Sequence, residues 1–284
     1  MKKCTITLLV VILSFCTLCQ SVLAEESLLL MAGAASAPVI EELAKAFEVK
    51  TGVRVHVNIG GSGMLLSQIK LTGKGDVYFP GSIDFIEQAK KENQIDASTI
   101  TPIVYLVPAI NVQRGNPQNI KNLKDLCRPG LKVAIANPES VCLGVFATEL
   151  FEKNLSSAEI QALRQNLVTY TESCEKTATA ISLKAVDAII GWGVFEHWNP
   201  ELIETVKLKP EEIVRISYLA VAVTKYAGNP ATARNFIEFM KSDEGLAFFK
   251  KFKYFTTSAE ALEYLGADKP VGGEPFKVPP TWMH

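Results

Sequence analysis

The chain has 284 residues, of which 48% are hydrophobic and 21% are charged, a balance that is typical of globular proteins and argues against a disordered chain. The length is enough for one large domain or two domains of medium size. The formal net charge of -1 shows no excess of basic residues, so a nucleic acid, which needs a clustered positive face, is not an expected partner.

The N-terminal segment 1–24 is typical of an export signal. Two lysines precede a run of roughly 16 apolar or small residues, and a Val-Leu-Ala cleavage pattern ends at Ala24. We therefore expect cleavage after Ala24 and a periplasmic mature chain. A bilayer span needs about 20 apolar residues, so a retained membrane anchor is the weaker alternative. Cys16 and Cys19 follow bulky residues instead of the small ones of a lipid-attachment signal, so both are expected to leave with the signal.

Strands and helices alternate in the first part of the mature chain. The apolar pattern predicts strands at 28–31, 53–59 and 75–81, with helices through 39–51 and 65–69 between them and a helix near 83–92 after them. Gly52 stands just past the first helix, where a glycine is common. Strand–helix alternation with short connections predicts a mostly parallel sheet, whose ligands collect at the carboxyl ends of the strands.

Two of these helices begin beside a serine. Ser36 stands before Pro38, and Ser62 lies in the Gly-Gly-Ser-Gly corner 60–63. Amide groups at a helix start have no partner within the helix and carry partial positive charge, so they bind an anion without a basic side chain. A serine before a helix is most often only an N-cap, which is the alternative interpretation of each. Two such serines at adjacent strand ends favour an anion site.

The pattern restarts in the second part of the chain. A long apolar strand at 101–117 is followed by the block LKVAIANPES, a helix at 144–153, the block AVDAIIGWG and a second long strand around 211–225. Two long strands that bracket a middle block predict that the chain crosses to a second lobe and returns.

The expected division follows from these two crossings. Residues 25–107 and 218–284 would form lobe 1, and residues 108–217 would form lobe 2, with the two crossover strands as the hinge. Helices near 230–241 and 243–251 would pack on lobe 1. The last 16 residues, KPVGGEPFKVPPTWMH, have the composition of a loop.

The mature chain keeps three cysteines, Cys127, Cys142 and Cys174. Cys142 and Cys174 each stand at a predicted helix start, which would bring them together at the same amide-rich edge, although simple capping is again an alternative. A disulfide between these two is therefore the expected pairing, with Cys127 left over. The cysteine spacings match no zinc pattern, so no metal cation is expected. An exported enzyme with one of these thiols as nucleophile and His197 as base is a further alternative.

Four stretches resemble a known family. They are AGAASAPVIEELAKAFEVKTGVRVHVNIGGSGMLLSQI, GKGDVYFPGSIDFIEQA, VAIANPESVCLGVFATELFE and AVDAIIGWG, and they are similar to the periplasmic molybdate-binding proteins of ABC importers, within the larger group of two-lobed solute-binding proteins. The resemblance implies an α/β fold of the type II periplasmic-binding-protein kind. Each lobe would be a mixed, mostly parallel sheet flanked by helices.

The resemblance also implies a function. The chain would be a monomer that is not an enzyme, uses no cofactor, binds molybdate or tungstate and delivers it to an ABC permease in the inner membrane. In that family hydroxyl and backbone N–H groups hold a tetrahedral dianion between the lobes. Carried over to this sequence, the ligand-binding positions are Ser36, Ser62, Leu143, Cys174 or Glu175, and Trp192.

Two positions depart from the family pattern. Trp192 stands where many members have a tyrosine, and an indole can donate but cannot accept a hydrogen bond; burial in the core is its alternative role. Glu175 would put a carboxylate beside a dianion. Sulfate, phosphate or a small organic solute is therefore an alternative ligand. Phosphate still carries a proton near neutrality and needs a carboxylate acceptor, for which Glu175 and Asp84 are the only candidates.

Overall fold

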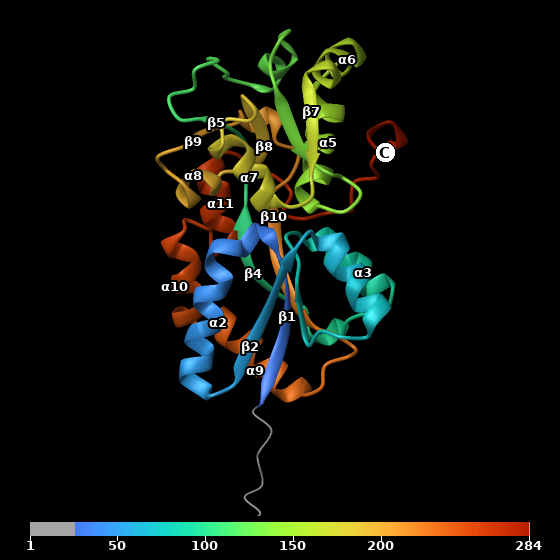
Figure 1. The fold of residues 1–284 in the computed structure, drawn as a ribbon, viewed down its shortest axis with the longest axis vertical. Helices are drawn as coiled ribbons and strands as arrows, with labels where there is room; N and C mark the ends of the chain where they lie inside the picture. The colour runs from blue at the N-terminus through green and yellow to red at the C-terminus, as the bar shows by residue number, and fades with distance from the viewer. Residues whose placement is uncertain (1–25, 284) are drawn as a thin grey trace, which may run out of the picture.

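The computed structural model describes residues 26–283, and these form two β-sheets with helices packed around each (Figure 1). The export signal predicted for residues 1–24 lies outside the described residues. Between residues 26 and 283, no helix is both long enough and apolar enough to cross a bilayer.

The first sheet, in the lower half of Figure 1, has five strands in the order β2-β1-β3-β10-β4. Their bounds are β1 Ser27–Gly33, β2 Arg54–Gly60, β3 Val77–Phe79, β4 Thr101–Leu106 and β10 Ser217–Val223. The first three strands in this order are parallel, whereas β10 is antiparallel to both β3 and β4. The helices of this lobe are α2 Ala37–Thr51, α3 Ser62–Thr72, α4 Ile83–Lys91, α9 Pro230–Lys241, α10 Asp243–Lys251 and α11 Ser258–Leu265.

The second sheet, in the upper half of Figure 1, has the order β7-β6-β8-β5-β9. Its strands are β5 Pro108–Gln113, β6 Val133–Ala136, β7 Leu167–Thr171, β8 Ala188–Trp192 and β9 Ile203–Val206. Strands β7, β6 and β8 are parallel, and β5 pairs antiparallel with β8 and β9. The helices are α5 Cys142–Asn154, α6 Ser157–Asn166, α7 Cys174–Ser182 and α8 Phe195–Trp198. The predicted fold class, two lobes with mixed and mostly parallel sheets, is confirmed.

Helix α2 shows why the local pattern predicts the first lobe well. Pro38 lies in its first turn, where the missing N–H costs nothing because that group has no helical partner. Its inward residues, among them Ile40 and Phe47, are buried at helical spacing. The helix ends at Gly52, which has φ 76° and closes the last turn in the left-handed region that glycine favours.

Both predicted long strands are interrupted, which corrects the expectation of two continuous crossover strands. The segment 101–117 divides at Val107 into β4 and β5, because these two strands pair within different sheets. The segment 211–225 opens in a 3-10 helix, Pro210–Glu212, and becomes a strand only at Ser217. The lobe boundaries expected at 107/108 and 217/218 stay a prediction.

The C-terminal segment is not simply a loop. It returns from α11 to the second lobe, where the chain end lies beside α5 (Figure 1). The side chain of Trp282 is fully buried, stacks on Phe151 with ring centroids 5.7 Å apart, and donates a hydrogen bond from Nε1 to Glu152. This tail therefore fastens the first lobe to the second through an aromatic anchor.

Candidate functional site

The parallel strands of the first lobe end at one edge, and three turns meet there. β1 leads to Ser36, β2 leads to Ser62, and β3 leads to the small residues Gly81 and Ser82. The amide of Gly81 donates to Ser62 Oγ over 3.0 Å, which joins the second turn to the third. Ser36 Oγ donates to the carbonyl of Gly33 over 3.0 Å. The two predicted serines are 0% and 2% exposed, so both lie inside the protein.

Neither serine side chain caps its own helix. Ser36 occupies the N-cap position of α2, but its side chain accepts no hydrogen bond from that helix. Ser62 is already inside α3, whose N-cap is Gly61. Ser62 Oγ accepts a hydrogen bond from the Gly81 amide, which leaves its own hydrogen for an acceptor, and the Cys142 sulfur is one such neighbour. Neither side chain is therefore an N-cap in this structure, and the ligand-binding role of the two serines stays a prediction.

The second lobe closes directly over the start of α3. The amide of Gly63 donates to the carbonyl of Ser140 over 2.9 Å, across the two lobes. A Cβ placed on Gly61 would lie 2.8 Å from the carbonyl oxygen of Glu172, closer than real side chains come. Glycine is thus needed at 61 and 63 because backbone atoms of the segments before α5 and α7 lie against these two positions.

Helices α5 and α7 bring two predicted positions to this junction. Leu143, the second residue of α5, is buried, and the N-cap Val141 offers no side chain to its amides. Cys174 opens α7 and is 2% exposed. The start of α5 therefore has no side-chain cap, whereas the start of α7 is capped by Ser173, whose hydroxyl accepts a hydrogen bond from the Lys176 amide.

Cys142 and Cys174 lie together, but the expected disulfide between them is not formed. Both residues are free thiols in the structure, and so is the half-buried Cys127. Hydrogen bonding with Cys174 and burial raise the pKa of Cys142 well above its ordinary value, while a hydrogen bond with Ser62 opposes the rise. The Cys142 thiol is therefore neutral, and it contacts both lobes: a Cβ on Gly81 would lie 2.6 Å from its sulfur.

The other two predicted positions differ in burial. Glu175 is exposed on the first turn of α7, so its carboxylate lies outside the buried junction, and its role as a ligand-binding position stays a prediction. Trp192, at the end of β8, is fully buried and packs edge-to-face on Phe146 with centroids 5.1 Å apart. Its Nε1 is nevertheless a buried donor without a hydrogen-bond partner. A buried donor without a partner is costly, so it is a group that a ligand could satisfy.

Sequence reasoning missed two participants of the first lobe. Ser82 is 0% exposed, and its hydroxyl is also without a partner. Gly81 supplies the amide that orients Ser62. The signal that could have found them was a small-residue turn after the third parallel strand, which is the same device as the first two turns.

A buried ion triad lies beside the junction and bridges the lobes. Arg215, just before β10, makes a two-point contact with Asp84 of α4 and donates from Nε to Glu149 of α5 over 2.8 Å. The guanidinium also lies 4.3 Å from the centre of the Phe146 ring. Burial raises the pKa of Glu149, against the lowering influence of Arg215. Asp84, which the sequence offered as a proton acceptor for phosphate, is thus already engaged.

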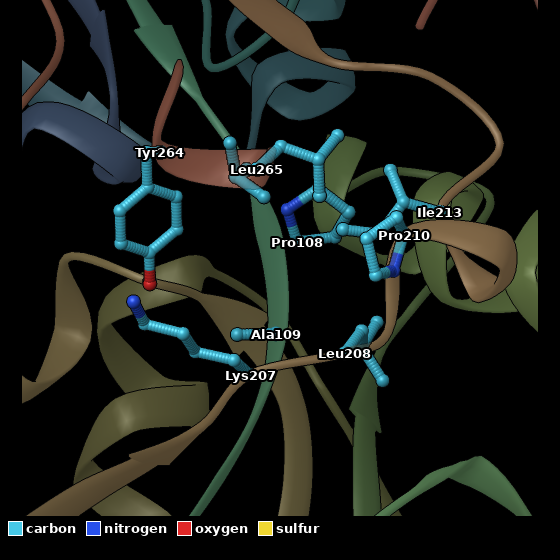
Figure 2. Close-up of a pocket in the computed structure, with 10 residues that line it drawn as sticks. Pro108, Ala109, Lys207, Leu208, Pro210, Ile213, Tyr264 and Leu265 are labelled. Carbon is cyan, nitrogen blue, oxygen red and sulfur yellow. The ribbon is translucent and has the colours of Figure 1, made fainter. Parts of the chain in front are cut away.

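A cavity of 170 Å³ is lined by residues of β5, of the segment that follows β9, and of α11 (Figure 2). Pro108, Leu208 and Pro210 form apolar walls, and the Lys207 amine points toward the hydroxyl end of Tyr264. His197, expected as the base of a cysteine enzyme, is exposed and lines the adjoining cavity instead of contacting the buried thiols.

Two relatives of this chain are both described as binding proteins. A Haemophilus influenzae protein described as a binding protein is 30% identical over 227 residues, covering 78% of this chain and 88% of its own length. The molybdate-binding protein ModA of Escherichia coli is 23% identical over 256 residues, covering 85% of this chain and 94% of its own.

Solved structures share the fold at lower identity. The sulfate-binding protein SubI of Mycobacterium tuberculosis superposes with a TM-score of 0.73 at 17% identity, covering 87% of this chain and 94% of its own. PEB3 bound to L-phospholactate gives a TM-score of 0.66 at 21% identity, covering 81% of this chain and 100% of its own. At these identities the likeness concerns the fold alone.

Two lobes that meet at a buried junction of helix starts are the architecture that the chain shares with the sulfate-binding protein SubI. Residues 28–254 match the family model of the bacterial extracellular solute-binding proteins. The chain belongs to this family, whose members serve ABC transporters.

Proposed function

We propose that this chain captures a tetrahedral oxyanion, molybdate or tungstate, between its two lobes and passes it to an ABC permease in the inner membrane. The observation that carries the proposal is the meeting of three strand-end turns of one lobe with two helix starts of the other. Two serine hydroxyls lie at the meeting point, Ser36 and Ser62, and both are buried. Such a centre suits an anion because it offers hydrogen-bond donors without introducing a positive side chain.

The donors of the proposed site come from both lobes. The first lobe supplies the hydroxyls of Ser62 and Ser82, and that of Ser36 once its hydrogen turns from the Gly33 carbonyl to the ligand. The second lobe supplies the amides of Leu143 and Cys174 together with the Trp192 Nε1. Hydrogen bonds to a charged acceptor are shorter and stronger than neutral ones. Closure of the lobes excludes water, and the lower local dielectric strengthens each of these contacts.

The geometry favours a fully ionised dianion over phosphate. Phosphate keeps a proton near neutral pH and needs an acceptor for it. Glu175 is exposed, and Asp84 accepts two hydrogen bonds from Arg215, so neither carboxylate is available at the junction. That E. coli ModA binds molybdate supports the same assignment, whereas SubI is a sulfate-binding protein and keeps sulfate as the competing ligand.

Membership of the extracellular solute-binding protein family also supports a location for the protein in the cell. A solute-binding protein meets its ligand outside the inner membrane, so we propose that residues 1–24 direct export and that the mature protein is a periplasmic monomer. Mass spectrometry of the mature protein would test this, with an N-terminus at Glu25 as the expected result.

The direct test is a thermal-shift panel on the purified mature chain with molybdate, tungstate, sulfate, phosphate and chromate. A ligand that binds only the folded state raises the melting temperature, so molybdate and tungstate should give the largest increases. Ser62→Ala should weaken binding by about tenfold or more, because a hydrogen bond to a charged group contributes about 1.5–3 kcal/mol. Ser182→Ala, at the far end of α7, is the matched control. A panel in which no oxyanion shifts the melting temperature would contradict the proposal.

A further inference from the structure

A second cavity between the lobes lies beside the proposed oxyanion centre. Its volume is 310 Å³, and both lobes line it: Gly193, Val194 and His197 from the second, and Lys250, Lys253, Tyr254, Phe255 and Tyr264 from the first, with Val107 between. It shares Val107, Gly193 and Tyr264 with the smaller cavity of Figure 2. Ligand pockets in proteins begin at about 300 Å³, so this space is of the size that holds a small organic molecule.

The lining of the two cavities carries charge of one sign. Lys207 lines the smaller one, Lys250 and Lys253 line the larger one, and no acidic residue lines either. The whole chain, in contrast, has a formal net charge of -1. A cleft lined by one sign of charge between low-dielectric walls concentrates ions of the opposite sign.

Two carboxylates close in sequence to the lining residues make contacts of their own. Glu196 forms an ion pair with Arg114 at 2.9 Å. Glu260 accepts a hydrogen bond from the Thr256 amide over 2.7 Å, and this bond is the main reason that its pKa is lowered, with Lys250 a smaller influence.

Lys250 and Lys253, which line the cavity, differ from Lys251 in their ion pairing. Within residues 26–283, neither Lys250 nor Lys253 forms a salt bridge, whereas Lys251 pairs with Glu42 at 2.8 Å. Two cations without carboxylate partners at the edge of a cavity are free to bind an anionic group there.

Aromatic rings supply the remaining wall. The rings of Phe255 and Tyr264 have centroids 5.0 Å apart, and the Lys207 amine lies 4.0 Å from the centre of the Tyr264 ring. Tyr254 separates the cavity from the oxyanion centre, because its ring lines the cavity while its hydroxyl donates to the carbonyl of Ala35 over 2.5 Å. A bare tetrahedral ion would leave these rings unused, whereas a flat organic body would cover them.

We propose that this cavity is a second binding site, for a small organic anion that joins a flat apolar body to a dianionic phosphate group. The lysines hold the phosphate, and the rings of Phe255 and Tyr264 pack against the body. The site goes beyond the proposed oxyanion function and uses other residues, so either can exist without the other.

Phenyl phosphate is the probe that tests the proposal, by calorimetry on the full mature chain. We expect it to bind at least tenfold more tightly than inorganic phosphate, which lacks the ring, and phenol, which lacks the charge. Lys250→Gln combined with Lys253→Gln should reduce the affinity for phenyl phosphate at least tenfold, because each lysine contributes a charge-assisted hydrogen bond to the phosphate. The matched control is Lys241→Gln combined with Lys251→Gln, which removes the same charge from lysines paired with Glu238 and Glu42.

Several outcomes separate this site from the oxyanion centre. Phenyl phosphate that binds no better than inorganic phosphate, or that binds equally to both lysine variants, would overturn the second site. Binding that is lost in Ser62→Ala but kept in Lys250→Gln/Lys253→Gln would place the phosphate among the serines and also overturn it. If molybdate does not bind at all while phenyl phosphate binding depends on the two lysines, the second site stands and the oxyanion function fails.

Discussion

Arg215 holds Asp84 by two parallel hydrogen bonds, Nη1 to Oδ1 at 2.8 Å and Nη2 to Oδ2 at 2.9 Å, and both side chains are almost completely buried. The two residues are 131 positions apart in the chain, and the pair ties α4 of the first lobe to the segment that returns from the second. A buried ion pair is tolerated because each charge satisfies the other.

Asp84→Ala should therefore destabilise the protein strongly. The change leaves the Arg215 guanidinium buried with Glu149 as its single remaining carboxylate, and breaking a buried pair in this way costs about 3–5 kcal/mol. Urea unfolding measures the free energy directly. Glu238→Ala breaks the exposed Glu238–Lys241 pair and should cost less than about 1 kcal/mol. Equal losses in the two variants would show that the buried pair has no special role.

Gly61→Ala should hinder closure of the lobes. The added methyl group would lie 2.8 Å from the Glu172 carbonyl and 3.0 Å from the Ser140 carbonyl, and both belong to the opposite lobe. We expect weaker molybdate binding and a larger radius of gyration with ligand present, measured by calorimetry and by X-ray scattering. Gly228→Ala is the control, because its Cβ would meet only Asp76 at an ordinary 3.8 Å. A ligand affinity equal to that of the unmodified chain would argue against close contact at Gly61.

Trp192→Phe tests whether the buried indole donates to the ligand. The change keeps an aromatic ring against Phe146 and removes the Nε1 donor, which is without a partner in the structure. If the ligand accepts this hydrogen bond, the affinity for molybdate should fall by about tenfold. Calorimetry beside Ser62→Ala gives the comparison. An affinity that stays within twofold would mean that Trp192 is only a wall of the site.

Lowering the pH should reduce the free energy of unfolding, in part through protonation of Glu159. The Ser156 amide, the Ser156 hydroxyl and Lys124 lower the pKa of this carboxyl from 4.5 to about 2. A lowered pKa in the folded state means that the carboxylate stabilises the fold above pH 4.5 and that this contribution is lost as the pH falls through the interval down to about 2. Glu159→Gln should flatten the dependence of the urea midpoint on pH over that interval. A curve unchanged by the substitution would show that the capping box of α6 contributes nothing there.

Trp282→Ala should release the C-terminal tail from the second lobe. Truncation of a fully buried tryptophan costs about 3–5 kcal/mol. Met283→Ala, one residue further along, is a suitable control because Met283 is 43% exposed. Limited proteolysis should cut the tail of Trp282→Ala first. Resistance equal to that of the control would mean that Trp282 does not anchor the tail.

Local pattern predicted the helices and the parallel strands well, because burial at spacing 2 or 3.6 depends only on neighbours in the chain. It failed for the two crossover segments. Strand β4 ends at Leu106 and β10 begins at Ser217 because each strand must pair in a particular sheet, and strand pairing is a contact between distant residues. It also failed for Trp282, whose partners Phe151 and Glu152 lie on the other lobe.

The candidate site also has parts that the sequence predicted and parts that it did not predict. The serine turns could be predicted from their residues, since Gly and Ser directly before an apolar helical pattern indicate a turn at the start of a helix. Ser82 and Gly81 could not be placed, because their relation to Ser62 depends on how β3 pairs with β1. The neutral Cys142 thiol could not be predicted as such, because its raised pKa comes from Cys174 and burial.

The sequence by itself determined that the chain is an α/β protein of two lobes with serines and glycines at helix starts, since residue type and spacing set local conformation. Only the tertiary structure decided which of these groups meet. It placed Asp84 against Arg215, left Glu175 in solvent and gathered His197, Lys250 and Lys253 around one cavity. Electrostatic and hydrogen-bond energies depend on distance through space, and a linear sequence does not contain those distances.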